Sequence, residues 1–176
     1  YGGALRLTSA MLFSIGFITM FIIGGLSGVM LGAVPVNWQV HQTYFVVAHL
    51  HYVLFGGSVF GIFSAFYYWI PKMSGWMMNE RLGKIHFWLS AVGVNVTFFP
   101  QHFLGLAGMP RRIPDYATQF ADWNAVSSVG AFLFGFSQLM FVYIVVKCIR
   151  GGKQATAQVW DNPEGLEWTV PSPAPY

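Results

Sequence analysis

Hydrophobic positions along the chain fall into four long runs separated by polar stretches. The runs cover residues 7–34, 43–70, 85–106 and 125–149. Because about 20 apolar residues cross the hydrocarbon core of a bilayer as an α-helix, each run predicts one transmembrane helix. We therefore expect an all-α integral membrane protein with a four-helix membrane segment over residues 1–150.

The polar stretches predict connections and a tail. Residues 71–84 form a short polar loop, and residues 108–124 form a loop that contains Pro and Asp. The chain after Gly151 and Gly152 is polar and rich in Pro, so we expect residues 151–176 to be an extended tail on the surface. No signal peptide or internal repeat is visible, and Tyr1 at the position of an initiator Met indicates a fragment of a longer chain.

Composition supports the membrane assignment. Hydrophobic residues make up 55% of the chain and charged residues only 9%, against about 25% charged residues in soluble domains. The single Cys148 excludes a disulfide framework and a site with several thiolates, and we expect a buried free thiol. The net charge of +3 comes from scattered basic residues, so no nucleic-acid partner is expected.

The basic residues predict the orientation in the membrane. If both termini are cytoplasmic, seven of the nine basic residues lie inside, as the positive-inside rule requires. These seven are Arg6, Lys72, Arg81, Lys84, Lys147, Arg150 and Lys153. Only Arg111 and Arg112 then lie on the outer side.

Two histidines, His49 and His51, are separated by one residue inside the second run. Each residue of an α-helix advances about 100°, so these side chains point about 200° apart and cannot share one metal ion. A shared metal site on one helix needs a spacing of three or four residues. The spacing therefore indicates two separate partners on opposite faces, and imidazoles that leave one membrane helix in two directions suggest two hemes.

Arg111 and Arg112 lie next to the third run and need an anionic partner. Heme propionates would serve, and lipid phosphates reached by snorkelling are the alternative. His41 precedes the second run at the outer surface, where its position is equally consistent with a metal ligand and with an ordinary interfacial histidine.

The other histidines predict structural roles. His86 begins the third run beside Lys84, which predicts an interfacial position. His102 lies near its outer end, two residues after Pro100, which predicts a hydrogen bond to the interrupted backbone.

Small and aromatic residues in the runs predict packing. Gly24, Gly28 and Gly32 recur every four residues and predict a smooth helix face that a neighbouring backbone approaches closely. Phe98 and Phe99 are interpreted as ordinary core or lipid-facing side chains.

Three segments carry a resemblance to a known family. They are HQTYFVVAHLHYVLFGG at 41–57, KIHFWLSAVGVNVTFFPQHFLGLAGMPRR at 84–112 and WNAVSSVGAF at 123–132. Together they resemble the C-terminal third of subunit I of the heme–copper oxidases, in the cytochrome c oxidase branch. That catalytic subunit has twelve membrane helices, and the four runs resemble the last four.

The resemblance implies a role for each candidate residue. His49 would be the catalytic ligand of the high-spin heme that faces copper, and His51 an axial ligand of the low-spin heme. Arg111 and Arg112 would hold heme propionates, and His41 would bind a magnesium or manganese ion near subunit II. The hemes would be of the a type.

Two departures affect the outer metal site. The family usually has Asp after the histidine at 41 and another Asp four residues before it, where this chain has Gln42 and Asn37. A neutral amide ligates only through its carbonyl oxygen and brings no charge to the site.

The resemblance also implies partners outside this chain. The copper ligands, the cross-linked tyrosine, the second low-spin ligand and the main proton-channel residues lie in earlier helices of the family. A truncated or naturally split subunit I would therefore need the remainder of subunit I, subunit II with its dicopper site, subunit III, cytochrome c and membrane lipid. Such a complex, in a bacterial cytoplasmic or mitochondrial inner membrane, would reduce O₂ to water and pump protons. A quinol oxidase and a non-catalytic transport or assembly protein are the alternatives.

Overall fold

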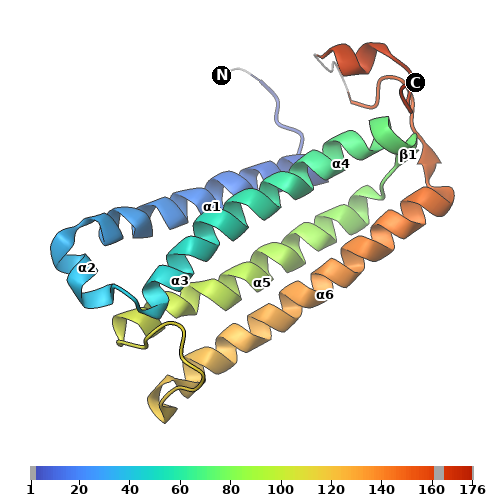
Figure 1. Ribbon diagram of the computed structural model, residues 1–176. Coiled ribbons are helices and arrows are strands. Elements are labelled where there is room, and N and C mark those ends of the chain that lie inside the picture. Colours follow the sequence, from blue (N-terminus) through green and yellow to red (C-terminus); the bar gives the residue numbers. More distant parts are fainter. Residues whose placement is uncertain (1–2, 161–164, 176) are drawn as a thin grey trace.

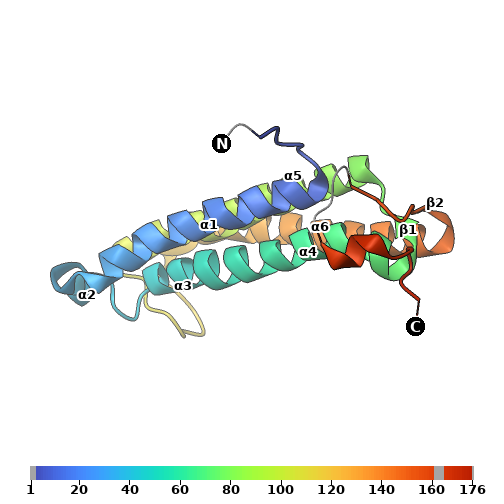
Figure 2. The same ribbon diagram turned by 90° about the horizontal axis from the view of Figure 1, so that it is seen from above.

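The computed structural model describes residues 3–160 and 165–175, which fold into long helical rods lying alongside one another (Figures 1 and 2). The first rod is α1, and the second is a continuous helix of 31 residues made of α3, the π-helix η1 and α4. The third and fourth rods are α5 and α6. Their bounds are Ser9–Gly32 for α1, Tyr44–Leu50 for α3, His51–Val59 for η1, Phe60–Ser74 for α4, Glu80–Leu106 for α5 and Ala121–Gly151 for α6.

Short elements complete the chain. Helix α2 (Val34–Val40) connects the first two rods, and the 3-10 helix η2 (Thr118–Phe120) precedes α6. The strands β1 (Trp76–Met77) and β2 (Lys153–Gln154) pair at the opposite end of the bundle. The 3-10 helix η3 (Leu166–Thr169) lies in the tail.

Three of the four expected membrane spans meet the requirements of length and apolar composition. These are α1, the rod Tyr44–Ser74 and the helix Thr118–Gly151. Helix α5 is long enough but too polar. It also begins at Glu80, ahead of the expected residue 85, because the Asn79 side chain caps it by accepting a hydrogen bond from the Leu82 N–H at 3.0 Å.

Polar side chains of α5 form hydrogen bonds with other rods inside the bundle. Ser90 Oγ lies 2.9 Å from Ser137 Oγ of α6. The Tyr52 hydroxyl of η1 donates to Asn95 Oδ1 at 2.7 Å. Hydrogen bonds between helices are a main source of association within membranes, where apolar surface alone gives no preference for protein over lipid. The low hydropathy of α5 therefore reflects its central position among the rods.

An aromatic cluster joins the rods at the end that carries the two termini. Phe13 of α1 is fully buried at its centre, with neighbouring ring centroids 5.1–5.6 Å away. Those rings belong to Phe60, Phe63, Tyr67, His86 and Phe87. Because they come from α4 and α5, the cluster fixes three rods against one another.

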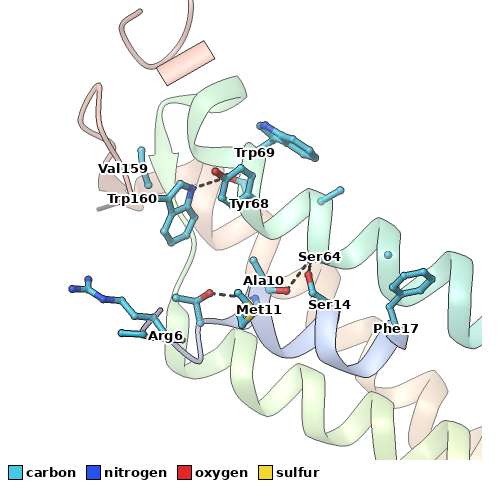
Figure 3. Close-up of a pocket in the computed structure, with 14 residues that line it drawn as sticks. Arg6, Ala10, Met11, Ser14, Phe17, Ser64, Tyr68, Trp69, Val159 and Trp160 are labelled. Carbon is cyan, nitrogen blue, oxygen red and sulfur yellow. Dashed lines mark hydrogen bonds between the residues drawn. The ribbon is translucent and has the colours of Figure 1, made fainter. Parts of the chain in front are cut away.

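The tail folds back over the end of α4 and is not extended. Strand β2 pairs antiparallel with β1, and the Ala155 N–H donates to the Gly75 carbonyl at 2.8 Å. Trp160 stacks on Tyr68 with ring centroids 5.5 Å apart, and its Nε1 donates to the Tyr68 carbonyl (Figure 3). The expectation of an extended tail is therefore wrong for the described residues.

Lys72 of α4 binds the tail through hydrogen bonds to its backbone. Its side chain is 5% exposed, and its Nζ donates to the carbonyl oxygens of Ala157 at 3.1 Å and Val170 at 2.7 Å. The same ammonium lies 5.1 Å from the centre of the Trp168 ring. A charge buried in this way is stable only with such a set of oxygen and aromatic neighbours.

The two ends of the bundle differ in charge. The seven basic residues predicted for one side all lie at the end formed by the start of α1, the α4–α5 turn and the end of α6 (Figure 1). Arg111 and Arg112 lie at the other end, in the connection between α5 and α6.

Candidate functional site

His49 lies in the last turn of α3, with its ring against α1. Its Nδ1 is 2.8 Å from the Gly24 carbonyl oxygen. A carbonyl oxygen can only accept a hydrogen bond, so Nδ1 carries the proton and Nε2 keeps its lone pair. Gly28 makes room for the ring, because a Cβ there would lie 2.7 Å from His49 Cε1.

His51 begins η1, with its ring against α5. Its Nδ1 lies 2.7 Å from the Val47 carbonyl oxygen, so the same argument leaves Nε2 free to bind a metal ion. The ring stacks on Phe98 with centroids 4.2 Å apart and planes 13° apart. His49 and His51 therefore contact different neighbouring rods, and each presents a metal-binding nitrogen.

The π-helix that begins at His51 was not predicted from the sequence. From His51 to Val59 the backbone follows the π-helical pattern, in which each N–H bonds five residues back. The expectation of an uninterrupted α-helix over 43–70 is wrong for this segment. Such segments are rare and often lie at functional sites.

The loop that carries the two arginines is fixed to the start of α3. Thr43 and Pro110 form an isolated bridge, and the Arg111 N–H donates to the Gln42 carbonyl at 2.9 Å. The rise of an α-helix from Thr43 to His49 is about 9 Å. The loop thus brings Arg111 and Arg112 to the end of the bundle nearest the two histidines.

Arg111 has a buried donor that lacks a partner. Its Nε is buried and has no hydrogen-bond acceptor among residues 3–160 and 165–175. A guanidinium stays charged, and a buried donor without a partner is costly, so a carboxylate fits this position well. Arg112 is exposed and adopts φ +62°, which turns the chain sharply after Arg111.

His41 lies at the same end and is exposed. The Nε2 of the neighbouring Gln42 lies 3.4 Å from His41 Nε2. Within the described part of the chain, no group of three or more His, Cys, Asp or Glu side chains could hold a metal ion.

His86 is not interfacial, contrary to the prediction from its position. It is fully buried, its Nδ1 lies 3.1 Å from the Tyr67 hydroxyl, and its ring stacks on Phe141. The early start of α5 carries it into the aromatic cluster. His102 bonds helix backbone as predicted, since its Nδ1 lies 3.2 Å from the Phe99 carbonyl. This carbonyl is not the one that loses its N–H partner at Pro100, which belongs to Val96.

The pocket drawn in Figure 3 is separate from these residues. It has a volume of about 900 Å³ and lies between the N-terminal arm, α1, α4 and the tail. Among the residues that the structure describes, no histidine lines it.

Comparison with known proteins identifies the family. The model described as "Cytochrome C and Quinol oxidase polypeptide I" matches residues 1–133. The chain belongs to this oxidase family. The resemblance inferred from the three sequence segments is thereby confirmed.

The relatives of this oxidase chain are much longer than the chain itself. It is 52% identical over 176 residues to cytochrome c oxidase subunit 1 of Thermostichus vulcanus and 49% identical over 177 residues to that of Cereibacter sphaeroides. These matches cover 98% and 99% of this chain but 31% of each relative. The chain thus spans about a third of the length of the curated relatives it matches.

A similar fold is found among solved structures. A chain of a heme-copper terminal oxidase dimer superposes with a TM-score of 0.74 and 20% identity, over 82% of this chain and 27% of that chain. At this identity the likeness concerns the fold of the oxidase chain alone.

Proposed function

We propose that this chain is the C-terminal part of subunit I of a terminal respiratory oxidase that reduces O₂ to water with electrons from cytochrome c and pumps protons. The observation that carries the proposal is the pair His49 and His51, which contact α1 and α5 respectively and each leave Nε2 free. In this proposal α5 is the fourth membrane span, and the rods are the last four of twelve.

The residues present fit two hemes. His49 would bind the iron of the high-spin heme and His51 that of the low-spin heme, with Arg111 and Arg112 near the propionates. When bound, the hemes supply electron transfer and oxygen activation. The protein positions the ligands: the carbonyls of Gly24 and Val47 fix which nitrogen of each imidazole is protonated.

Two further contacts serve the same positioning. Phe98 stacks on His51 and limits rotation of its ring. The Arg111 guanidinium, whose Nε lacks an acceptor in the described chain, would keep a propionate ionised and in place.

Other parts of the proposal concern the assembled complex. Copper, the second ligand of the low-spin heme and the remaining helices would come from the rest of subunit I. Subunit II with its dicopper site, subunit III, cytochrome c and lipid would be the partners, and His41 would take part in a magnesium or manganese site. Both termini would face the cytoplasm or the mitochondrial matrix.

The test of the proposal compares His49→Asn with His51→Asn in the assembled oxidase, purified with its other subunits. We expect His51→Asn to abolish the six-coordinate low-spin spectrum and His49→Asn to abolish the carbon-monoxide-binding, high-spin spectrum. The measurement is the reduced-minus-oxidised spectrum with and without carbon monoxide.

His102→Asn is the matched control, because this histidine lies in the same bundle and binds backbone through Nδ1. It should keep both spectra. Loss of the same heme in His49→Asn and His51→Asn would contradict the proposal. A complex without heme would favour the non-catalytic alternative, and oxidation of quinol in place of cytochrome c would favour a quinol oxidase.

A further inference from the structure

Ser27 of α1 forms a closed triangle with the two groups that position His49. Its Oγ lies 2.8 Å from the Gly24 carbonyl oxygen and 3.2 Å from His49 Nδ1. The third side is the 2.8 Å contact between that carbonyl and Nδ1. Ser27 is 5% exposed, so bulk water does not compete with its hydroxyl for the Gly24 carbonyl.

The direction of each hydrogen bond follows from the chemistry of the three groups. The carbonyl oxygen only accepts, so both the Ser27 hydroxyl and the His49 Nδ1–H donate to it. As a residue inside an α-helix, Gly24 also accepts the backbone N–H four residues later. Three donors thus share an oxygen that has two lone pairs, and the Ser27 hydroxyl competes with His49 for it.

We propose that Ser27 is a positioning residue that weakens the hydrogen bond from His49 to the Gly24 carbonyl and so limits the electron donation of His49 Nε2. This inference rests on the proposed function, in which His49 binds the high-spin heme iron.

The physical link runs through the imidazole ring. A strong hydrogen bond from Nδ1–H gives the ring partial imidazolate character and raises the basicity of the ligating nitrogen. A hydroxyl that occupies part of the same acceptor reduces this effect. The Ser27 Oγ can itself accept from Nδ1–H, but its 3.2 Å contact is longer than the 2.8 Å bond to the carbonyl, so the competition for the carbonyl dominates. Ser27 therefore acts on the bond between His49 and its metal ion without touching that ion.

The experiment is Ser27→Ala in the assembled oxidase. Without the competing hydroxyl, the iron–histidine stretching band of the reduced high-spin heme should move to higher frequency in the resonance Raman spectrum. The reduction potential of the same heme should fall. Ser27→Thr keeps a hydroxyl at this position and should leave both values at those of the unmodified protein.

Two more variants keep the test decisive. Ser27→Cys retains a side chain of similar size with a weak donor, and it should move the band upward by less than Ser27→Ala. Ser14→Ala is the matched control on α1, because its hydroxyl bonds Ser64 at 2.6 Å and not His49 (Figure 3). It should leave the band unchanged.

The outcomes separate this inference from the proposed function. An unshifted or lowered band in Ser27→Ala and Ser27→Cys, with the band itself present, overturns the inference about Ser27. A high-spin heme that persists in His49→Asn overturns the assignment of His49 and, with it, the basis of the inference.

Discussion

Two glycines of α1 allow the rod that carries His49 to lie directly against that helix. A Cβ at Gly24 would lie 2.7 Å from Val53 Cγ2, and a Cβ at Gly28 would lie 2.7 Å from His49 Cε1. At Gly32 an added Cβ would meet nothing within 4 Å. Gly24 therefore allows close packing of the two rods, and Gly28 leaves room for the His49 ring. The smooth face predicted from the glycine spacing does not extend to Gly32.

Gly28→Ala should selectively weaken the high-spin heme site. The added methyl group must displace the His49 ring or α1, which disturbs the hydrogen bond to Gly24 at a cost of about 1–3 kcal/mol. We expect fewer carbon-monoxide-binding hemes per low-spin heme, measured optically on the purified complex. Gly25→Ala, whose Cβ would meet nothing within 4 Å, is the control. Equal heme ratios in the two variants would contradict the prediction.

The sequence predicts the separation of His49 and His51 because it depends only on helix periodicity. Which ring nitrogen of His49 carries the proton could not be predicted, because its hydrogen-bond partner Gly24 belongs to another helix. The stacking of Phe98 on His51 was missed for the same reason. His86 was placed wrongly because its burial depends on where α5 begins.

Helices α5 and α6 approach closely where glycines face backbone. A Cβ at Gly130 of α6 would overlap the backbone nitrogen of Thr97, and a Cβ at Gly93 of α5 would lie 2.8 Å from the Phe134 nitrogen. The Ser127 hydroxyl donates to the Thr97 carbonyl at 2.5 Å within the same contact. Backbone atoms cannot move aside as a flexible side chain does, so both positions require glycine.

Gly130→Ala should lower the stability of the bundle, whereas Gly135→Ala on the same helix should not. Overpacking against backbone costs about 1–3 kcal/mol, while Ala in an open helix position is favoured over Gly by about 1 kcal/mol. A Cβ at Gly135 would meet nothing within 4 Å. The midpoint of thermal unfolding in detergent measures the effect, and equal midpoints would contradict it.

The rods themselves were predictable from the lengths of the apolar runs. The π-helical segment His51–Val59 was not, because no local residue pattern distinguishes it from an α-helix. The start of α5 could have been found, since Asn79 followed by Glu80 is a common signal for the beginning of a helix. The polarity of α5 is explained only by the partners that its side chains meet in other rods.

At the scale of the whole molecule, the basic residues are concentrated at one end of the bundle, where the tail also lies.

The fold of the tail was predicted poorly. The prediction used its polar composition, whereas a few single residues determine how it folds. Trp160 and Trp168 pack on α4, and Lys72 binds carbonyl oxygens of the tail. The average polarity of residues 151–176 gives no sign of these individual contacts.

The charge distribution predicts which side of the membrane a protease reaches. Lys147, Arg150 and Lys153 are exposed at the basic end, so trypsin should remove the tail in inside-out vesicles and leave it intact in right-side-out ones. The fragment sizes on a gel check this expectation. Arg111→Gln with Arg112→Gln should not change the pattern, and cleavage of the tail from the outer side would contradict the orientation.

Lys72 can form its final hydrogen bonds only after the tail has been synthesised. The carbonyl of Val170 that receives its shortest hydrogen bond follows it by 98 residues. A ribosome that adds about 5–20 residues per second needs on the order of 5–20 s to cover that distance. During this interval the ammonium lacks its final neighbours and must stay hydrated at the membrane surface. The end of α4 therefore settles only after the helices that follow it have been made, which delays completion of this end of the bundle until the nascent chain has reached the tail.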